Sequence, residues 1–146
     1  MTASTLSPAE LQRFLEGAFP GSGASFQVVA ADSEGCDLVL KVAEHLARPG
    51  GTVSGPALMT LCDTAAWLAI LAQIGEVALA VTTSLHIDFL RKPPLDQDLV
   101  AEGRLLKLGR RLGVVAVSVR PVTGDRAPVA HAQVTYSIPP GATPAA

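Results

Sequence analysis

Residues 50–75, GGTVSGPALMTLCDTAAWLAILAQIG, form an almost uninterrupted apolar stretch that contains one carboxylate, Asp63, near its middle. Ser54 can cap a helix with its hydroxyl group, and Gly55 and Pro56 fit the first helical turn. The pattern after Ser54 is apolar on every side, which is typical of a helix enclosed by other elements rather than lying on a surface. We therefore predict a long buried helix that begins at Ser54.

A membrane span is the main alternative for this stretch, because about 20 apolar residues can cross the hydrocarbon core. An ionised aspartate near the centre of a span costs roughly 2.5 to 3.5 kcal/mol even on lenient scales. Gln73, Gly75 and Glu76 also weigh against a span, and no flanking Lys/Arg asymmetry sets an orientation. The stretch is therefore predicted to be a core helix over residues 54–74, with no contact to a membrane.

Six β-prone segments accompany this helix in the chain. Residues 25–32 and 36–43 flank the turn sequence SEG and predict a hairpin. Four more segments follow the helix and are separated by the turn sequences KPPLD, GRR and TGD; they span residues 77–91, 97–109, 112–122 and 127–139. Two strands, one long helix and four strands joined by short turns predict an α+β fold, with an antiparallel sheet wrapped around a central helix.

The remaining segments complete one domain. The serine, proline and acid that open SPAELQRFLEGA are helix-start signals, and the apolar stripe after them predicts a short helix over residues 8–18. With 146 residues, of which 49% are hydrophobic, the chain can bury a single core, which we place in residues 1–138. Residues 139–146, PPGATPAA, have no apolar pattern and are predicted to be a disordered tail.

Composition and charge exclude several classes of partner. A formal net charge of -2 and a pI near 5.8 give no general attraction to nucleic acid or to anionic lipid. Cys36 and Cys62 lack metal-ligand spacing and are too few for a disulfide framework. His45, His86 and His131 are too scattered for a zinc site. The N-terminus has no basic start followed by an apolar stretch, so we predict a cytoplasmic protein without a signal peptide or a metal.

Four segments resemble the hotdog-fold thioesterases of the phenylacetate-degradation type, across about residues 45–138. They are GGTVSGPALMTLCDTAAWLAI, AVTTSLHIDFLRKP, LVAEGRLLKLGRRLGVVAVSVRP and PVAHAQVTYSI. The resemblance implies a hotdog fold and hydrolysis of acyl-CoA thioesters without a metal or an organic cofactor. The order of elements in that family agrees with the order predicted above from the residue pattern.

By position, the resemblance assigns three residues to catalysis. Asp63 matches the family's carboxylate, Gly55 the glycine whose N–H polarises the thioester carbonyl, and Thr82 a hydroxyl that helps to place the attacking water. Thioester hydrolysis needs an activated nucleophile and a stabilised oxyanion, which a carboxylate and a helix N–H group can supply. Asp63 can act as a general base on water or attack the carbonyl to form a mixed anhydride, and the sequence leaves both routes open.

The chain departs from the family motif at three positions. Ser54 stands where histidine is usual, Pro56 replaces a glycine, and Arg48 stands where asparagine is usual. These changes remove two side chains that align the substrate in the family. A second hypothesis is therefore a non-catalytic hotdog module that binds an acyl thioester or acts as an assembly partner. A hotdog dehydratase fits less well, since that chemistry needs a histidine in the site.

The two ends of the catalytic motif cannot act together within one chain. The start of the helix and Asp63 are nine residues apart, which is roughly 13 to 14 Å along the axis and on opposite faces. If both act on one thioester, Asp63 comes from one chain and Gly55 from another, with the helices antiparallel across a two-fold axis. We therefore predict a homodimer or a dimer of dimers.

An acyl-CoA substrate also needs groups that bind its phosphates and its acyl chain. Arg48 and Ser54 are candidates because they occupy substrate-aligning positions of the family. Two basic pairs at strand ends are candidates for the CoA phosphates; they are Arg91, Lys92, Arg110 and Arg111. The apolar surroundings of Asp63 predict an aromatic or medium-chain acyl group.

Overall fold

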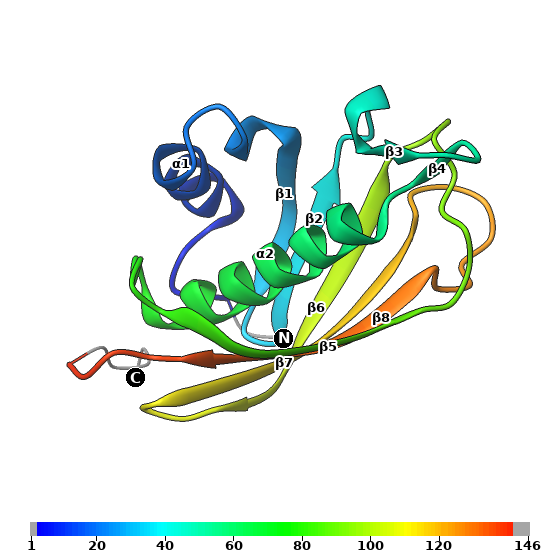
Figure 1. The fold of residues 1–146 in the computed structure, drawn as a ribbon. Coiled ribbons are helices and arrows are strands. Elements are labelled where there is room, and N and C mark those ends of the chain that lie inside the picture. The colour runs from blue at the N-terminus through cyan, green and yellow to red at the C-terminus, as the bar shows by residue number, and fades with distance from the viewer. Residues whose placement is uncertain (1–2, 142–146) are drawn as a thin grey trace.

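The computed structural model describes residues 3–141, so most of the predicted C-terminal tail lies outside the described residues (Figure 1). The helices are α1 (Pro8–Ala18) and α2 (Gly55–Ile74), with short 3-10 turns η1 (Gly23–Ser25) and η2 (Glu44–Leu46). The strands are β1 (Phe26–Asp32), β2 (Gly35–Leu40), β3 (Ala47–Arg48), β4 (Thr52–Val53), β5 (Val81–Phe89), β6 (Leu99–Leu108), β7 (Leu112–Pro121) and β8 (Ala130–Ser137). The predicted α+β class, an antiparallel sheet around a long helix with a short N-terminal helix, is confirmed.

The main sheet has six strands in the order β1-β2-β6-β7-β8-β5, and every neighbouring pair is antiparallel. A separate two-stranded hairpin, β3-β4, precedes α2 and was not predicted from the sequence. Each of its strands has two residues, which is too short for an alternating pattern. Gly50 and Gly51 make its turn with φ values of 102° and 75°, a conformation that glycine adopts without steric cost.

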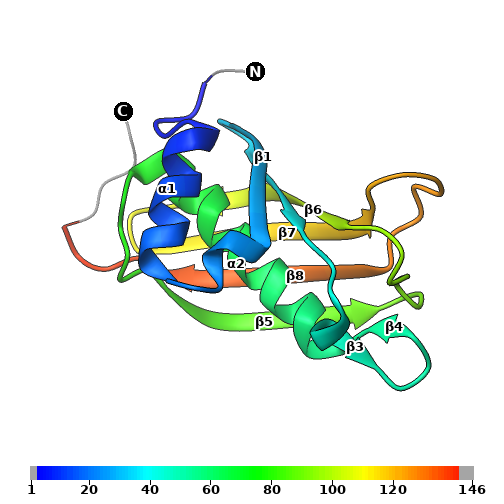
Figure 2. The same cartoon turned by 90° about the horizontal axis from the view of Figure 1, so that it is seen from above.

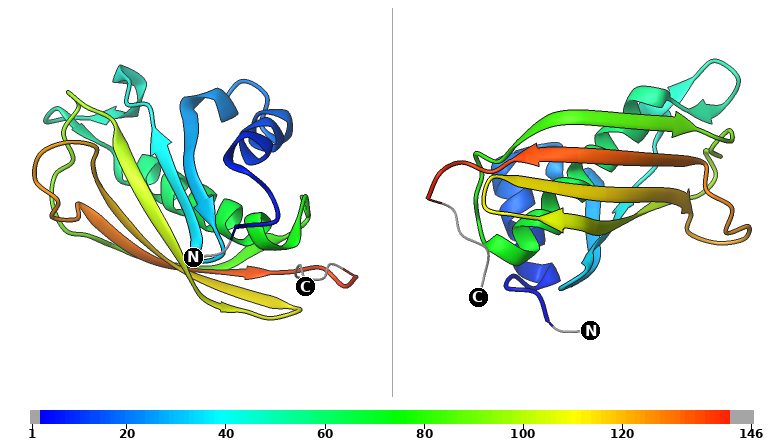
Figure 3. Two further views of the ribbon diagram at one scale, coloured as in Figure 1. Left: turned by 180° about the vertical axis from the view of Figure 1, so that it is seen from behind. Right: turned by 90° about the horizontal axis from the view of Figure 1, so that it is seen from below.

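Helix α2 lies across one face of the curved sheet, while the opposite face carries no helix among the described residues (Figures 2 and 3). Leu61, Ala65 and Leu68 of α2 are completely buried, as expected for a helix that is apolar on every side. Gly113 permits the close approach of helix and sheet, because a Cβ there would lie 2.7 Å from Cδ1 of Ile70. The long apolar stretch therefore serves as the core of the domain.

The ends of α2 follow from its terminal residues. Ser54 is the N-cap, and its Oγ accepts a hydrogen bond from the backbone N–H of Ala57 at 3.3 Å. Gly75 ends the helix with a φ of 98°. By length and composition alone α2 could span a membrane, but 61% of its most apolar part is buried inside the fold.

The two edge strands of the sheet, β1 and β5, have different neighbours. Helix α1 packs beside β1, where Gln12 accepts a hydrogen bond from Val28 N at 2.7 Å and donates one to Phe26 O at 3.0 Å. Within residues 3–141, β5 pairs only with β8 and leaves its other edge open. Its terminal residues Val81 and Phe89 are 55% and 52% exposed. An open strand edge with exposed apolar side chains is a surface that can pair with another chain.

Candidate active site

Asp63 receives hydrogen bonds from two strands of the sheet. Thr82 Oγ1 of β5 donates to Asp63 Oδ1 at 2.6 Å, and Tyr136 Oη of β8 donates to the same oxygen at 2.8 Å. The Tyr136 hydroxyl also lies 3.0 Å from the backbone oxygen of Asp63. The carboxylate is thus held in place by its own chain.

The register of the strands explains why both hydroxyl groups reach the helix. Thr82 and Tyr136 are direct partners across the β5-β8 ladder, so their side chains point to the same face of the sheet. The ladder shifts register between Thr82 and Ser84, at a bulge that contains Thr83. Beyond the bulge, the side chains of β5 that point toward the helix are apolar; they begin at Leu85 and continue at every second residue. The bulge therefore confines the polar inward position to the end of the strand beside Asp63.

A cavity of about 280 Å³ opens beside Asp63. Its aromatic wall is formed by Phe19, which follows α1, and by Trp67, one turn further along α2 than Asp63. The centroids of the two rings are 5.6 Å apart in an edge-to-face arrangement. The centroid of the Phe14 ring also lies 5.6 Å from that of Trp67. The cavity is lined by Phe19, Asp63, Thr64, Trp67, Ala78, Ala80, Val81, Thr82 and Tyr136, which include no basic residue.

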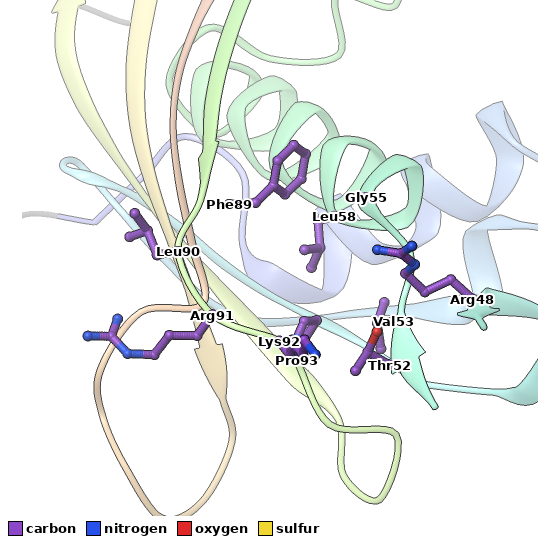
Figure 4. A pocket seen from close by; sticks show the side chains of 10 residues that line it. All are labelled: Arg48, Thr52, Val53, Gly55, Leu58, Phe89, Leu90, Arg91, Lys92 and Pro93. Carbon is purple, nitrogen blue, oxygen red and sulfur yellow. The ribbon is translucent and has the colours of Figure 1, made fainter. Parts of the chain in front are cut away.

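Gly55 lies in a different cavity, of about 370 Å³, at the N-terminal end of α2 (Figure 4). Phe89 and Leu58 form its apolar wall, and a Cβ added to Gly55 would contact the Phe89 ring at 3.4 Å. The full lining is Arg48, Thr52, Val53, Gly55, Leu58, Phe89, Leu90, Arg91, Lys92 and Pro93, which include no carboxylate.

The first turn of α2 presents one free backbone donor to this cavity. Leu58 N bonds to Ser54 O at 3.2 Å, Ala57 N bonds to Ser54 Oγ, and Pro56 has no N–H. Within residues 3–141 the N–H of Gly55 has no hydrogen-bond acceptor. The sequence Ser-Gly-Pro therefore leaves a single unpaired N–H at the positive end of the helix dipole.

The predicted basic residues fall into two groups at opposite ends of the sheet. Arg48 and Lys92 border the Gly55 cavity, whereas the Arg91 side chain points away from Gly55 and donates to Pro128 O at 2.7 Å (Figure 4). Arg110 and Arg111 lie in the β6-β7 turn. The first residue of β7, directly after that turn, pairs with Ser137 of β8. The first residue of β5 pairs with the same serine. The second basic pair therefore lies at the Asp63 end of the sheet.

The structure brings together some of the predicted site residues and separates others. Asp63 and Thr82 are in contact, but Gly55 belongs to the other cavity with Arg48. The continuous α-helix keeps Gly55 and Asp63, which are eight residues apart in the chain, roughly 12 Å apart along the axis. Ser54 acts as the helix cap. Among residues 3–141 no group of three or more His, Cys, Asp or Glu side chains is arranged to hold a metal ion.

Sequence reasoning missed Tyr136 and the aromatic pair beside Asp63. Tyr136 is the chain's one tyrosine, and it alternates with the inward-facing Val134 and Ala132 on β8. The signal available in the sequence was an aromatic ring with a hydroxyl group, on a strand face whose other side chains are apolar. Burial raises the pKa of the Tyr136 hydroxyl well above its ordinary value. The hydroxyl therefore stays protonated and able to donate.

Comparison with known proteins gives a consistent family. The family model described as "Thioesterase superfamily" matches residues 50–128. A candidate thioesterase from Silicibacter sp. TM1040 is 41% identical over 95% of this chain and 96% of its own, with a TM-score of 0.87. Zebra fish thioesterase superfamily member 2 shares the fold, at 19% identity over 92% of this chain and 100% of its own, with a TM-score of 0.82.

One solved structure in this group carries a ligand. A Streptococcus mutans UA159 protein, solved bound to acetyl CoA, is 25% identical over 78% of this chain and 88% of its own, with a TM-score of 0.69. No curated protein matches the chain.

Proposed function

The chain belongs to the thioesterase superfamily, and on that premise we propose that it hydrolyses an acyl-CoA thioester to a free acid and CoA. One observation carries this proposal: the chain forms two separate cavities, and each contains a functional group that the other lacks. One holds a carboxylate and no basic residue, and the other holds an unpaired helix N–H and cations but no carboxylate. Thioester hydrolysis needs one group from each.

The proposed reaction uses Asp63 and Gly55 on opposite sides of the thioester carbonyl. Asp63 takes a proton from water, and the resulting hydroxide attacks the carbonyl carbon. The carbonyl oxygen becomes an oxyanion that accepts a hydrogen bond from the Gly55 N–H. When the C–S bond breaks, the CoA thiolate takes up the proton from Asp63. Direct attack by Asp63, followed by hydrolysis of a mixed anhydride, uses the same groups and stays open.

The proposed site is shared between two chains in a homodimer or a dimer of dimers. Pro56, Met59 and Thr60 form an exposed stripe of α2 between Gly55 and Asp63, and Met59 is 42% exposed. The edge of β5 that is open within residues 3–141 offers backbone groups to which a second copy can pair. With two α2 helices antiparallel across a two-fold axis, Asp63 of each chain faces Gly55 of the other.

The cavities support a substrate class. Arg48 and Lys92, beside the positive end of α2, are suited to the phosphates of CoA. The rings of Phe19 and Trp67 beside Asp63 are suited to an aromatic or medium-chain acyl group, as in the phenylacetate-degradation type. The acetyl-CoA bound to the Streptococcus mutans protein supports CoA as the carrier. We place the reaction in the cytoplasm.

Ser54 favours a second candidate, a hotdog module that binds acyl thioesters without turnover. Its hydroxyl is engaged as the N-cap of α2, so it does not supply the second aligning side chain that a histidine supplies in the family. In this candidate the two cavities bind the thioester but do not cleave it.

The two candidates separate in one experiment. Purified protein is mixed with a panel of aromatic, medium-chain and short acyl-CoAs, and release of free CoA is followed together with binding by calorimetry. The proposal expects turnover, fastest for aromatic or medium-chain acyl groups. Binding of these substrates without CoA release would contradict hydrolysis and support the binding module.

A further inference from the structure

The two oxygens of Asp63 have different surroundings. Oδ1 accepts hydrogen bonds from both Thr82 and Tyr136, whereas Oδ2 has no partner among residues 3–141. Every buried side-chain nitrogen or oxygen in this part of the chain has a hydrogen-bond partner. Oδ2 is therefore accessible rather than enclosed, and it is free to meet a water molecule or a substrate.

The two donors occupy Oδ1 fully. A carboxylate oxygen has about two lone-pair directions, and two hydroxyl groups at 2.6 and 2.8 Å use both. Hydrogen bonds of hydroxyl groups to a carboxylate are among the stronger side-chain contacts in proteins. Rotation of the carboxylate that exchanged Oδ1 for Oδ2 would break both bonds, so the two hydrogen bonds hold one oxygen in place and leave the other free.

The two donors differ in how firmly they are held. Thr82 lies on the outer strand β5, where its side chain is exposed, while Tyr136 is 4% exposed on the inner strand β8. The Tyr136 hydroxyl also lies near the backbone oxygen of Asp63, so it is anchored to the helix itself. Tyr136 thus supplies the more rigid of the two contacts.

We infer that Tyr136 is a positioning residue that fixes Oδ1 of Asp63 and thereby leaves Oδ2 as the oxygen that reacts. The inference rests on the proposed hydrolysis and deepens it, because it assigns the proton transfer or the nucleophilic attack to one atom. Tyr136 acts through Asp63 and touches no reacting atom in this assignment.

The first arm of the test is kinetic and uses Tyr136→Phe, which removes the hydroxyl and keeps the ring. Loss of a hydrogen bond to a carboxylate should lower kcat for acyl-CoA roughly ten-fold or more. KM and Tm should stay close to those of the unchanged protein, because the ring still fills its place in the core. Thr135→Val is the matched control, since it removes a hydroxyl from the outward face of the same strand.

The second arm does not depend on turnover. Because Tyr136 is the single tyrosine, tyrosine labelled with ¹³C at Cζ gives one NMR resonance that reports its hydrogen bond. Asp63→Asn should shift that resonance, while Thr135→Val should leave it in place. An unshifted resonance in Asp63→Asn would overturn the contact on which the inference stands.

The outcomes separate this inference from the proposed function. Turnover by the unchanged protein, with a lower kcat in Tyr136→Phe at constant KM and Tm, supports both. Turnover that Tyr136→Phe leaves at full kcat overturns the positioning role and leaves the proposed hydrolysis intact. Absence of turnover in the unchanged protein contradicts the proposed hydrolysis, and with it the reactive role of Oδ2, even where the NMR arm finds the Tyr136 contact.

Discussion

Asp63 and Gly55 lie on the same helix, but their surroundings differ. Asp63 is held by two hydroxyl groups from the sheet, beside an aromatic wall, and its cavity is lined by no Lys, Arg or His side chain. Within residues 3–141, Gly55 has an unpaired backbone N–H, in a larger cavity with Arg48 and Lys92 at its border. The carboxylate is held by hydrogen bonds from its own chain, whereas the cavity at Gly55 contains no carboxylate of its own chain.

This difference suits what each group does in the proposed reaction. A carboxylate that transfers a proton has to be held at a fixed angle, and neighbouring strands provide that. An oxyanion donor at a helix N-terminus is rigid without help, because the backbone fixes it. The two halves are therefore complementary, and the following variants test each of them.

The largest effect is expected at the carboxylate. Asp63→Asn keeps the size of the side chain and replaces the charged acceptor of the two hydroxyl groups with a neutral, weaker one, and it removes the base. We expect kcat to fall roughly 100- to 10,000-fold, which is the usual contribution of a general base. Thiol release from the preferred acyl-CoA measures it. Unchanged activity would remove Asp63 from the mechanism.

The donor half is tested by a matched pair at Gly55. Gly55→Pro deletes the N–H at the first helical position, where proline is tolerated and where no intrahelical bond is lost. Removal of one oxyanion donor lowers kcat roughly 100- to 1,000-fold. Gly55→Ala keeps the N–H and adds a Cβ at ordinary contact distance from Phe89, so its kcat should stay near that of the unchanged protein. Equal losses in both variants would show that space, and not the N–H, matters at this position.

The cations at the donor half should affect binding more than turnover. Arg48→Gln should raise KM for acyl-CoA about 3- to 10-fold, in line with one exposed charge contact. The KM for the same acyl group on N-acetylcysteamine, which lacks phosphates, should not change. Arg13→Gln, on the exposed face of α1, is the control for a general loss of charge. A KM increase on both thioesters would argue against a phosphate contact at Arg48.

The smallest effect is expected at the two buried thiols, one of which lies on the face of α2 that packs into the core. Cys62 precedes Asp63 but is completely buried, and burial raises the pKa of its thiol, like that of Cys36, to about 12. Both thiols should resist a disulfide reagent at pH 8 in the folded protein and react after unfolding. As the pH rises above about 9, thiols ionise in the unfolded chain only, so the free energy of unfolding should decrease. Rapid reaction in the folded state would show that this face of the helix is open.

The helix and the sheet were predictable because their signals are periodic and local. The apolar stretch after Ser54 specified α2, and the alternating segments separated by turns specified the six strands. The β3-β4 hairpin was missed because two-residue strands carry no period. Fold class therefore followed from the sequence, while this small hairpin beside Gly55 did not.

The site was predictable only where a single residue stands out. Asp63 is conspicuous as a lone charge in an apolar helix, and its spacing from Gly55 already separated the two halves. The contact with Tyr136 depends on the register of β5 against β8, which is set by a bulge that no local pattern marks. The grouping of Phe19 with Trp67 likewise depends on how α1 packs against α2.

In the proposed enzyme, each site takes its carboxylate from one chain and its N–H donor from another. Asp63→Asn and Gly55→Pro chains, each with a kcat reduced at least about 100-fold alone, can be co-expressed with different affinity tags and purified as the mixed dimer. One intact site should form in each mixed dimer, so about half of the unchanged dimer's kcat should return. A mixed dimer that forms but stays inactive would contradict the shared site.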